Sequence, residues 1–131
     1  MEFNRMIPEL TVKDIRKTKA FYMDLLGFKL EYEREADQFI FLSFEGSQFM
    51  FEQIHDEGWY TAPMDYPFGR GINFSIEADH IDALYEKLLQ AGYPLYRPLT
   101  VTAYEADGKR LEQKEFLVQD PDGYLMRFTQ E

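Results

Sequence analysis

The alternation of apolar and polar residues divides the chain into two similar halves. In the first half, residues 7–12 alternate with the period of a strand, and residues 15–26 carry apolar side chains at helical spacing. Asp14 is typical of a helix N-cap, and Gly27 is typical of a helix end. The stripe of this helix that should face a core comprises Ile15, Thr18, Tyr22 and Leu25, with Phe21 and Leu26 beside it. Further strands are expected over residues 28–33, 38–44 and 48–54, with a tight turn over residues 45–47.

The second half repeats this order of elements. Residues 72–76 alternate as a strand, Asp79 is a candidate N-cap, and Gly92 is typical of a helix end. The helical stripe between them comprises Ile81, Leu84, Tyr85, Leu88 and Leu89. Strands are expected over residues 93–97, 114–119 and 124–129, with a turn over residues 120–123. Matching landmarks lie 64 residues apart (Val12 and Ile76), 63 apart (Tyr22 and Tyr85) and 65 apart (Gly27 and Gly92), which predicts a duplicated βαβββ unit.

Two segments do not fit the repeat. Residues 55–68 are rich in Trp, Tyr, Phe and Pro, and residues 99–111 include Tyr104 and Gly108, so both are interpreted as ordered loops over a cleft. We therefore expect one domain over residues 1–131. It would consist of module one at residues 5–54, a linker loop at residues 55–68 and module two at residues 69–131.

The amino-acid composition limits the classes of partner that the protein is expected to bind. The chain has 14 basic and 24 acidic residues and a net charge of −10, which disfavours binding to nucleic acid or an anionic membrane and favours a cationic ligand. The chain contains no cysteine, which excludes disulfides, thiolate zinc sites and cysteine nucleophiles. The first residues lack an apolar signal core, and no stretch reaches the length of a membrane span, so we expect a cytoplasmic protein.

Three motifs resemble those of one known family. They are residues 10–14 with Phe21–Phe28, residues 59–74 from Trp59 to Phe74, and the Asp-Pro-Asp-Gly-Tyr run at residues 120–124. The chain resembles the vicinal oxygen chelate superfamily, which includes glyoxalases, bleomycin resistance proteins and dioxygenases, and the middle motif is similar to its bleomycin-resistance branch. The resemblance implies an α+β fold of two βαβββ modules. Each module would be a curved sheet with helices on its outer face, the inner faces would form a cleft, and the protein would be a homodimer.

The resemblance also implies where a metal would bind. Enzymes of the superfamily take one metal ligand from each of four strands, and the matching positions here are Ile7, Glu52, Gly71 and Arg127. Only Glu52 can ligate a metal, because Ile7 and Gly71 have no donor and Arg127 is a permanent cation. We therefore expect no metal, no cofactor and no catalytic residue. His55 and His80 match none of these positions and are interpreted as solvated loop residues.

The same positions predict which strand residues face the cleft. Side chains alternate along a strand, so further residues should share the cleft face with the four positions: Glu9, Thr11, Met50, Asn73, Ser75, Leu125 and Thr129. The opposite set should pack under the helices: Leu10, Val12, Phe49, Phe51, Phe74, Ile76, Tyr124, Met126 and Phe128. Glu52 and Arg127 occupy matching positions of the two modules, so we hypothesise that they form an ion pair; alternatively, each points to solvent or pairs elsewhere.

Candidate ligand contacts come from the aromatic and polar residues of the cleft. Phe39, Trp59 and Tyr104 could stack on a flat heteroaromatic ring, although Phe39 could equally be a core residue. Trp59 and Tyr104 could instead lie at the surface or at a dimer interface. Arg70 and Asn73 belong to the branch motif, where their alternative role is structural. The candidate ligand-binding set is therefore Phe39, Glu52, Trp59, Arg70, Asn73, Tyr104 and Arg127.

The function that these features favour is binding without catalysis. We expect a metal-independent protein that sequesters a bleomycin-type or other aromatic ligand, including cationic ones, in a cleft. Two alternatives stay open at this point: a metal-dependent lyase or dioxygenase of the same superfamily, and a binder of an unrelated metabolite.

Overall fold

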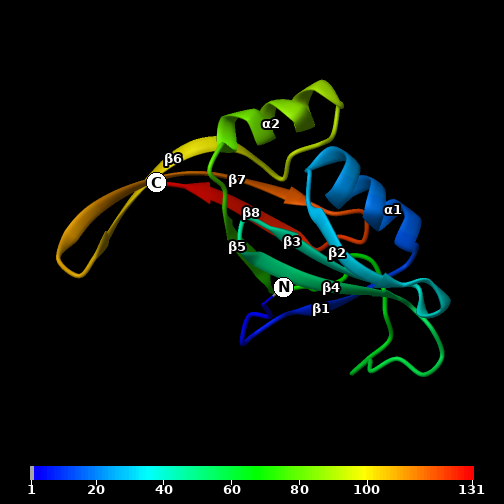
Figure 1. Ribbon diagram of the computed structural model, residues 1–131. Coiled ribbons are helices and arrows are strands. Elements are labelled where there is room, and N and C mark those ends of the chain that lie inside the picture. The colour runs from blue at the N-terminus through cyan, green and yellow to red at the C-terminus, as the bar shows by residue number, and fades with distance from the viewer. Residues whose placement is uncertain (1) are drawn as a thin grey trace. The chain divides into compact units, whose positions relative to one another are not determined.

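The computed structural model describes residues 2–131 and forms two compact units, one ending at Phe68 and the other beginning at Gly69 (Figure 1). Each unit contains a strand, a helical segment and three more strands, and each has one four-stranded sheet. The α+β class and the duplicated βαβββ order that the sequence predicts are therefore confirmed.

Module one is a mixed sheet with the strand order β1-β4-β3-β2. Its first strand is parallel to β4, and its other neighbouring strands are antiparallel. The turn between β3 and β4 is tight because Glu45 and Gly46 both adopt positive φ, as hairpin turns of two residues require. Its elements are β1 (Glu9–Val12), α1 (Ile15–Lys19), the π-helical η1 (Ala20–Leu25), β2 (Lys29–Arg34), the 3₁₀ turn η2 (Glu35–Asp37), β3 (Phe39–Phe44) and β4 (Ser47–Gln53).

The first helix is not one regular α-helix. Asp14 caps α1 by accepting a hydrogen bond from the Arg16 backbone N–H, as predicted, but the chain then continues as the π-helical segment η1. A π-turn is wider than an α-turn, so it advances the buried stripe by one residue. Leu26 is accordingly buried at 1% exposure, whereas Leu25, predicted on the same stripe, is only half-buried.

An aromatic cluster forms the core under this helical segment. The ring of Tyr22 is fully buried, and its centroid lies 4.7 Å from that of Phe51 and 5.1 Å from that of Phe28. Phe28 in turn stacks on Phe44 at 4.8 Å. Such ring pairs add to the free energy of ordinary apolar burial, so this cluster fixes one face of the sheet against the helix.

Module two repeats the topology with the strand order β5-β8-β7-β6, β5 being parallel to β8. Its buried helical residues are Ile81, Leu84 and Leu88. Helix α2 contacts β7 and β8, whose buried rings Phe116 and Phe128 stack on each other with centroids 5.4 Å apart (Figure 1). Leu89, predicted on the same stripe, is 48% exposed. The elements are β5 (Asn73–Glu77), α2 (Ile81–Gln90), β6 (Arg97–Ala106), β7 (Lys109–Gln119) and β8 (Leu125–Gln130).

Two expectations for module two are wrong. The predicted loop over residues 99–111 is a long β6–β7 hairpin, because Asp107 and Gly108 both take positive φ and close a tight turn between paired strands (Figure 1). The strand expected to begin at Tyr93 begins at Arg97. In addition, His80 rather than Asp79 is the N-cap of α2, and its side chain makes no capping bond; the first helical N–H, that of Ile81, is instead satisfied by the Gln130 side chain.

The alternation of faces within each sheet is as predicted. Apolar residues expected under the helices are buried, with Phe74 half-buried: Leu10, Val12, Phe49, Phe51, Ile76, Tyr124, Met126 and Phe128. The opposite face of each sheet carries the more polar set that contains Glu52 in module one and Arg127 in module two. Within residues 2–131, no helix is both long enough and apolar enough to cross a membrane.

Candidate functional site

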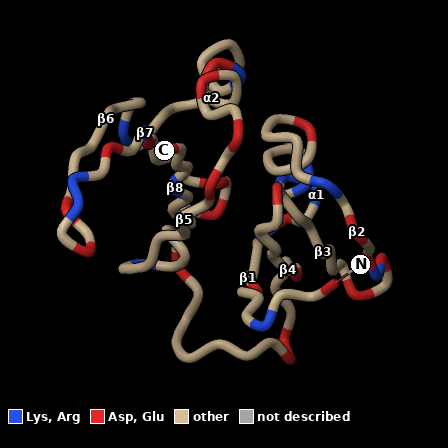
Figure 2. Tube along the Cα trace, turned by 60° about the vertical axis from the view of Figure 1, so that its left-hand side comes forward, with Lys and Arg blue, Asp and Glu red and all other residues tan. Residues whose placement is uncertain are grey.

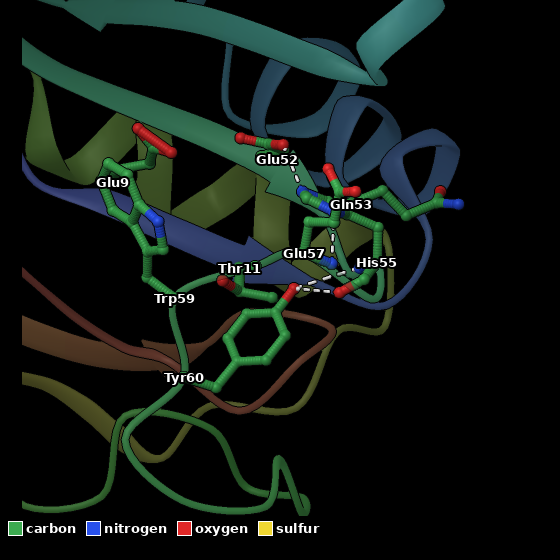
Figure 3. Close-up of a pocket in the computed structure, with 9 residues that line it drawn as sticks. Glu9, Thr11, Glu52, Gln53, His55, Glu57, Trp59 and Tyr60 are labelled. Carbon is green, nitrogen blue, oxygen red and sulfur yellow. Dashed lines mark hydrogen bonds and ion pairs between the residues drawn. The ribbon is translucent and has the colours of Figure 1, made fainter.

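A pocket of about 310 Å³ lies at the end of β1 and β4 in module one (Figure 3). Strand β1 contributes Glu9 and Thr11, β4 contributes Glu52 and Gln53, and the loop that follows β4 contributes the remaining wall. That wall consists of His55, Glu57, Gly58, Trp59 and Tyr60. Three of the lining side chains are carboxylates, and none of the lining residues that the structure describes is Lys or Arg, so the pocket favours a positively charged group.

The centre of the pocket is a contact between a carboxylate and an imidazole. Nε2 of His55 lies 2.7 Å from Oε1 of Glu52, and the backbone N–H of Glu57 donates to Nδ1 of His55 at 3.2 Å. Because Nδ1 accepts a hydrogen bond, the proton of the neutral ring is on Nε2, which donates to Glu52. His55 does lie in a loop, as predicted, but its ring is held by Glu52 instead of being merely solvated.

Tyr60 fastens the same loop. Its hydroxyl accepts a hydrogen bond from the backbone N–H of His55 at 3.1 Å and donates one to the carbonyl of His55 at 3.2 Å (Figure 3). A β-carbon at Gly58 would overlap the Tyr60 ring, so only glycine fits there without displacing the ring. We call the segment His55–Tyr60 the latch loop, since these contacts tie both of its ends to each other and, through Glu52, to β4.

Glu9 brings a second carboxyl to Glu52. Burial raises the pKa of Glu9, and the charge of Glu52 and a hydrogen bond between the two side chains raise that pKa further, while the charge of Arg34 lowers it. The two carboxyls therefore favour sharing a proton or binding a cation over carrying two negative charges side by side.

Trp59 stands in the pocket wall with its side chain almost wholly exposed, at 97%. Exposure of so large an aromatic surface is unfavourable in water, and a flat ligand stacked on the indole would remove part of that cost. Trp59 and Glu52 are thus two sequence-predicted residues that the structure brings to one pocket (Figure 3).

Phe39 lies beside the pocket but does not line it. It pairs with Glu52 across β3 and β4, so the two side chains share a face of the sheet. Phe39 is 2% exposed, and the guanidinium of Arg34 lies 3.9 Å from the centre of its ring. Its ring face is therefore covered by Arg34 in this structure, and any stacking of a ligand on Phe39 would require that guanidinium to move.

The other four sequence-predicted residues belong to module two. Arg70 is exposed in the turn before β5, and Asn73 is the first residue of β5. Tyr104 is 38% exposed on β6, in a strand and not in the predicted loop. Arg127 lies on β8, with Nη1 3.8 Å from Oε2 of Glu115. The ion pair of Arg127 is with Glu115 on the neighbouring strand.

The predicted ion pair between Glu52 and Arg127 stays a prediction. Within its own module Glu52 contacts His55, and within its own module Arg127 contacts Glu115. Each charge therefore has a partner close by in sequence or in the same sheet, which was the alternative that the sequence left open.

The residues at the superfamily's metal positions do not fit a divalent ion. Ile7 and Gly71 offer no donor atom, Arg127 carries a positive charge, and Glu52 alone can ligate. Among residues 2–131, no group of three His, Asp or Glu side chains is placed to share a metal ion.

Comparisons with known proteins agree with this fold. The family model described as Glyoxalase/Bleomycin resistance protein/Dioxygenase superfamily matches residues 4–128. Bleomycin resistance proteins of Geobacillus stearothermophilus and Staphylococcus aureus are 31% identical to the chain, over 95% of this chain and 95% of each relative. The chain therefore belongs to the glyoxalase/bleomycin resistance protein/dioxygenase superfamily. Within the superfamily it resembles bleomycin resistance proteins.

Solved structures show the same fold. The crystal structure of a glyoxalase/bleomycin resistance protein/dioxygenase from Alicyclobacillus acidocaldarius is 26% identical and has a TM-score of 0.67, covering 97% of this chain and 90% of its own. TioX from Micromonospora sp. ML1 is 18% identical with a TM-score of 0.75 over 98% of both chains, and shows the likeness of fold alone.

Sequence reasoning missed the residues that hold the pocket together. It placed Glu9 on the correct face but gave it no role, and it passed over Tyr60 and the bond between His55 and Glu52. A signal for the latch loop existed in the run His55-Asp56-Glu57-Gly58, which is typical of a turn. A turn at this point can bring the His55 ring, three residues after Glu52, back toward the end of β4.

Proposed function

We propose that this protein is a metal-independent small-molecule-binding protein that sequesters an aromatic, cationic ligand of the bleomycin type. The observation that carries the proposal is the module-one pocket, where an exposed indole stands in one wall with three carboxylates and no described basic residue. The relationship to bleomycin resistance proteins at 31% identity supports the choice of ligand class.

The pocket's size limits what it can hold. About 310 Å³ is at the lower end for ligand sites, so it accommodates one ring system with a charged substituent and not a whole glycopeptide. Trp59 supplies the stacking surface, and Glu52 and Glu9 attract the positive charge. The remaining candidates, Phe39, Arg70, Asn73, Tyr104 and Arg127, and the expected homodimer stay predictions.

The roles of the residues in this proposal are binding and positioning. The latch loop holds Trp59 in place before ligand arrives, because Tyr60 and Glu57 both fix His55 while His55 is bonded to Glu52. A preorganised loop binds more tightly than a mobile one, since less ordering entropy is lost on binding.

The test is a titration with metal-free bleomycin followed by fluorescence. Trp59 is the only tryptophan in the chain, so a saturable change in emission reports ligand at this wall. We expect Glu52→Gln to weaken binding about tenfold if the lost contact is charge-assisted. Glu35→Gln removes the same charge from the exposed turn η2 and is the matched control, which should leave the affinity unchanged.

Two results would contradict the proposal. The first is no change in emission and no calorimetric heat at micromolar bleomycin, which would favour an unrelated metabolite as ligand. The second is equal weakening by the two substitutions, which would indicate a general effect of net charge and not a contact in the pocket.

A further inference from the structure

A buried carboxylate lies between two arginines on one face of the module-two sheet. Leu117 on β7 pairs with Arg97 on β6 and with Arg127 on β8, so both arginines flank the same position from opposite sides. Glu115 precedes Leu117 by two residues and therefore points to the same face. Both ion pairs follow from this register: Glu115 Oε1 lies 3.9 Å from Arg97 Nη1, and Glu115 Oε2 lies 3.8 Å from Arg127 Nη1.

The charges of this cluster do not cancel. Two guanidinium groups face one carboxylate, which leaves one net positive charge. Both N–O separations exceed hydrogen-bonding distance, so the arginines are held near Glu115 by charge while their N–H groups do not bond to it. The hydroxyl of Thr102 donates to Glu115 at 3.1 Å, and that bond takes up part of the accepting capacity of the carboxylate.

Two buried polar atoms beside Glu115 also lack a partner among the described residues. They are Nε of Arg127 and the hydroxyl oxygen of Thr100, which pairs with Glu115 across β6 and β7. An unpaired buried donor destabilises the fold by the cost of its lost hydration, so the packing around Glu115 leaves part of the hydrogen-bonding capacity of Arg127 unused. Both atoms are covered, so a ligand would meet the exposed guanidinium nitrogens of the two arginines instead.

Access to the cluster is on the arginine side. The Arg97 side chain is 52% exposed and that of Arg127 is 39% exposed, whereas the Glu115 side chain is 7% exposed. Solvent therefore meets two planar donor groups with the carboxylate behind them. Guanidinium groups match the oxygens of carboxylates and phosphates in geometry and charge.

We propose that Arg97 and Arg127 form a binding site for an oxyanion group, a carboxylate or a phosphate, of a small molecule. The proposal does not depend on the module-one pocket, because all of its residues lie in module two. This site competes with the predicted pairing of Arg127 with Glu52, since the exposed N–H groups of one guanidinium cannot bind both an oxyanion and the Glu52 carboxylate. The experiment below separates the two possibilities.

The experiment follows the side-chain Nε–Hε resonances of arginine by nuclear magnetic resonance. The full chain is titrated with inorganic phosphate, and separately with benzoate, at constant ionic strength. We expect the Arg97 and Arg127 signals to shift with one shared dissociation constant. Tighter binding of phosphate than of benzoate would identify a phosphate site, and the reverse order would identify a carboxylate site.

Substitutions test the cluster with matched controls. Arg97→Gln should weaken binding about tenfold, because it removes a charged donor. Arg110→Gln, on the exposed part of the same hairpin, should leave the affinity unchanged. Glu115→Gln should strengthen binding several-fold, since it removes the competing negative charge while keeping an oxygen for Thr102. Glu52→Gln should have no effect.

Three outcomes would overturn the proposal. One is the absence of any shift at Arg97 and Arg127 with either anion. Another is equal weakening by the Arg97 and Arg110 substitutions, which would indicate screening by the general surface charge. The third is anion binding that becomes stronger after Glu52→Gln but is unchanged after Glu115→Gln. That result would show that Arg127 is paired with Glu52.

Discussion

Removal of the Tyr60 hydroxyl should loosen the wall that carries Trp59. Tyr60→Phe keeps the ring that packs beside Gly58 and deletes only the oxygen that bonds both backbone groups of His55. The backbone ends of the latch loop then lose their direct connection, while the bond from His55 to Glu52 is left intact.

The size of the effect follows from the two bonds that are lost. The N–H···O bond of 3.1 Å is near the long end of its normal range, the O–H···O bond of 3.2 Å is longer than usual, and the loop is partly open to water. We therefore assign the pair about 1 kcal/mol in total. If the latch loop interconverts between a closed and an open form, this change lowers the closed-to-open ratio, and with it the affinity, by up to about fivefold.

The assay uses the fluorescence of the single tryptophan. In Tyr60→Phe the steady-state anisotropy of Trp59 should fall, and metal-free bleomycin should bind up to fivefold more weakly with an unchanged final emission spectrum. The matched control is Tyr96→Phe, which removes an exposed hydroxyl in module two. An unaltered anisotropy together with an unaltered affinity would refute the positioning role of Tyr60.

Three further substitutions test other parts of the account. Burial and the charge of Glu52 raise the pKa of Glu9, so ionised Glu9 destabilises the folded state at neutral pH. Glu9→Gln should therefore raise the melting temperature at pH 7, and this gain should vanish in acid. A gain in melting temperature that grows in acid would contradict this reasoning. Gly58→Ala should displace Tyr60 and reduce the anisotropy of Trp59 more than Tyr60→Phe does. If the anisotropy of this variant equals that of the wild type, the positioning role of the latch loop is contradicted. Phe51→Ala should lower the free energy of unfolding by about 3–5 kcal/mol in denaturant titrations, because the ring is fully buried; a loss below 1 kcal/mol would exclude it from the core.

Periodicity was sufficient to predict the strands of each sheet that lie under helices, because each of those strands has one buried face. The alternation of Phe49 and Phe51 with Met50 and Glu52 fixes which residues are buried, and a shift by one residue would place charge in the core. The width of a π-turn has no such signature, so the exchange of Leu25 for Leu26 on the helical stripe could not be predicted.

The β6–β7 hairpin was missed for a different reason. Its outer part is exposed on both faces, so it lacks the apolar alternation that identifies a half-buried strand. Acidic and basic residues both lie along it (Figure 2). The pair Asp107-Gly108 was the available signal, since this dipeptide favours a tight hairpin turn.

The candidate site was predictable only in part. Family resemblance and alternation led to Glu52 and to the face that carries Glu9, and the abundance of aromatic residues led to Trp59. The contact of His55 with Glu52 depends on how the chain turns after β4, and the cluster around Glu115 depends on the register of a hairpin that the sequence did not suggest. The first contact is local but depends on a turn geometry that periodicity does not encode, and the second is a long-range consequence of the fold.

Calorimetry on the metal-stripped protein tests most directly whether the pocket binds its ligand without a metal. The protein is treated with a chelator, the chelator is kept in the buffer, and metal-free bleomycin is titrated into it beside an untreated sample. We predict saturable binding with the same dissociation constant in both samples, since Glu52, Glu9 and Trp59 need no metal to make their contacts. Binding that disappears after stripping, or no heat in either sample, would contradict the account.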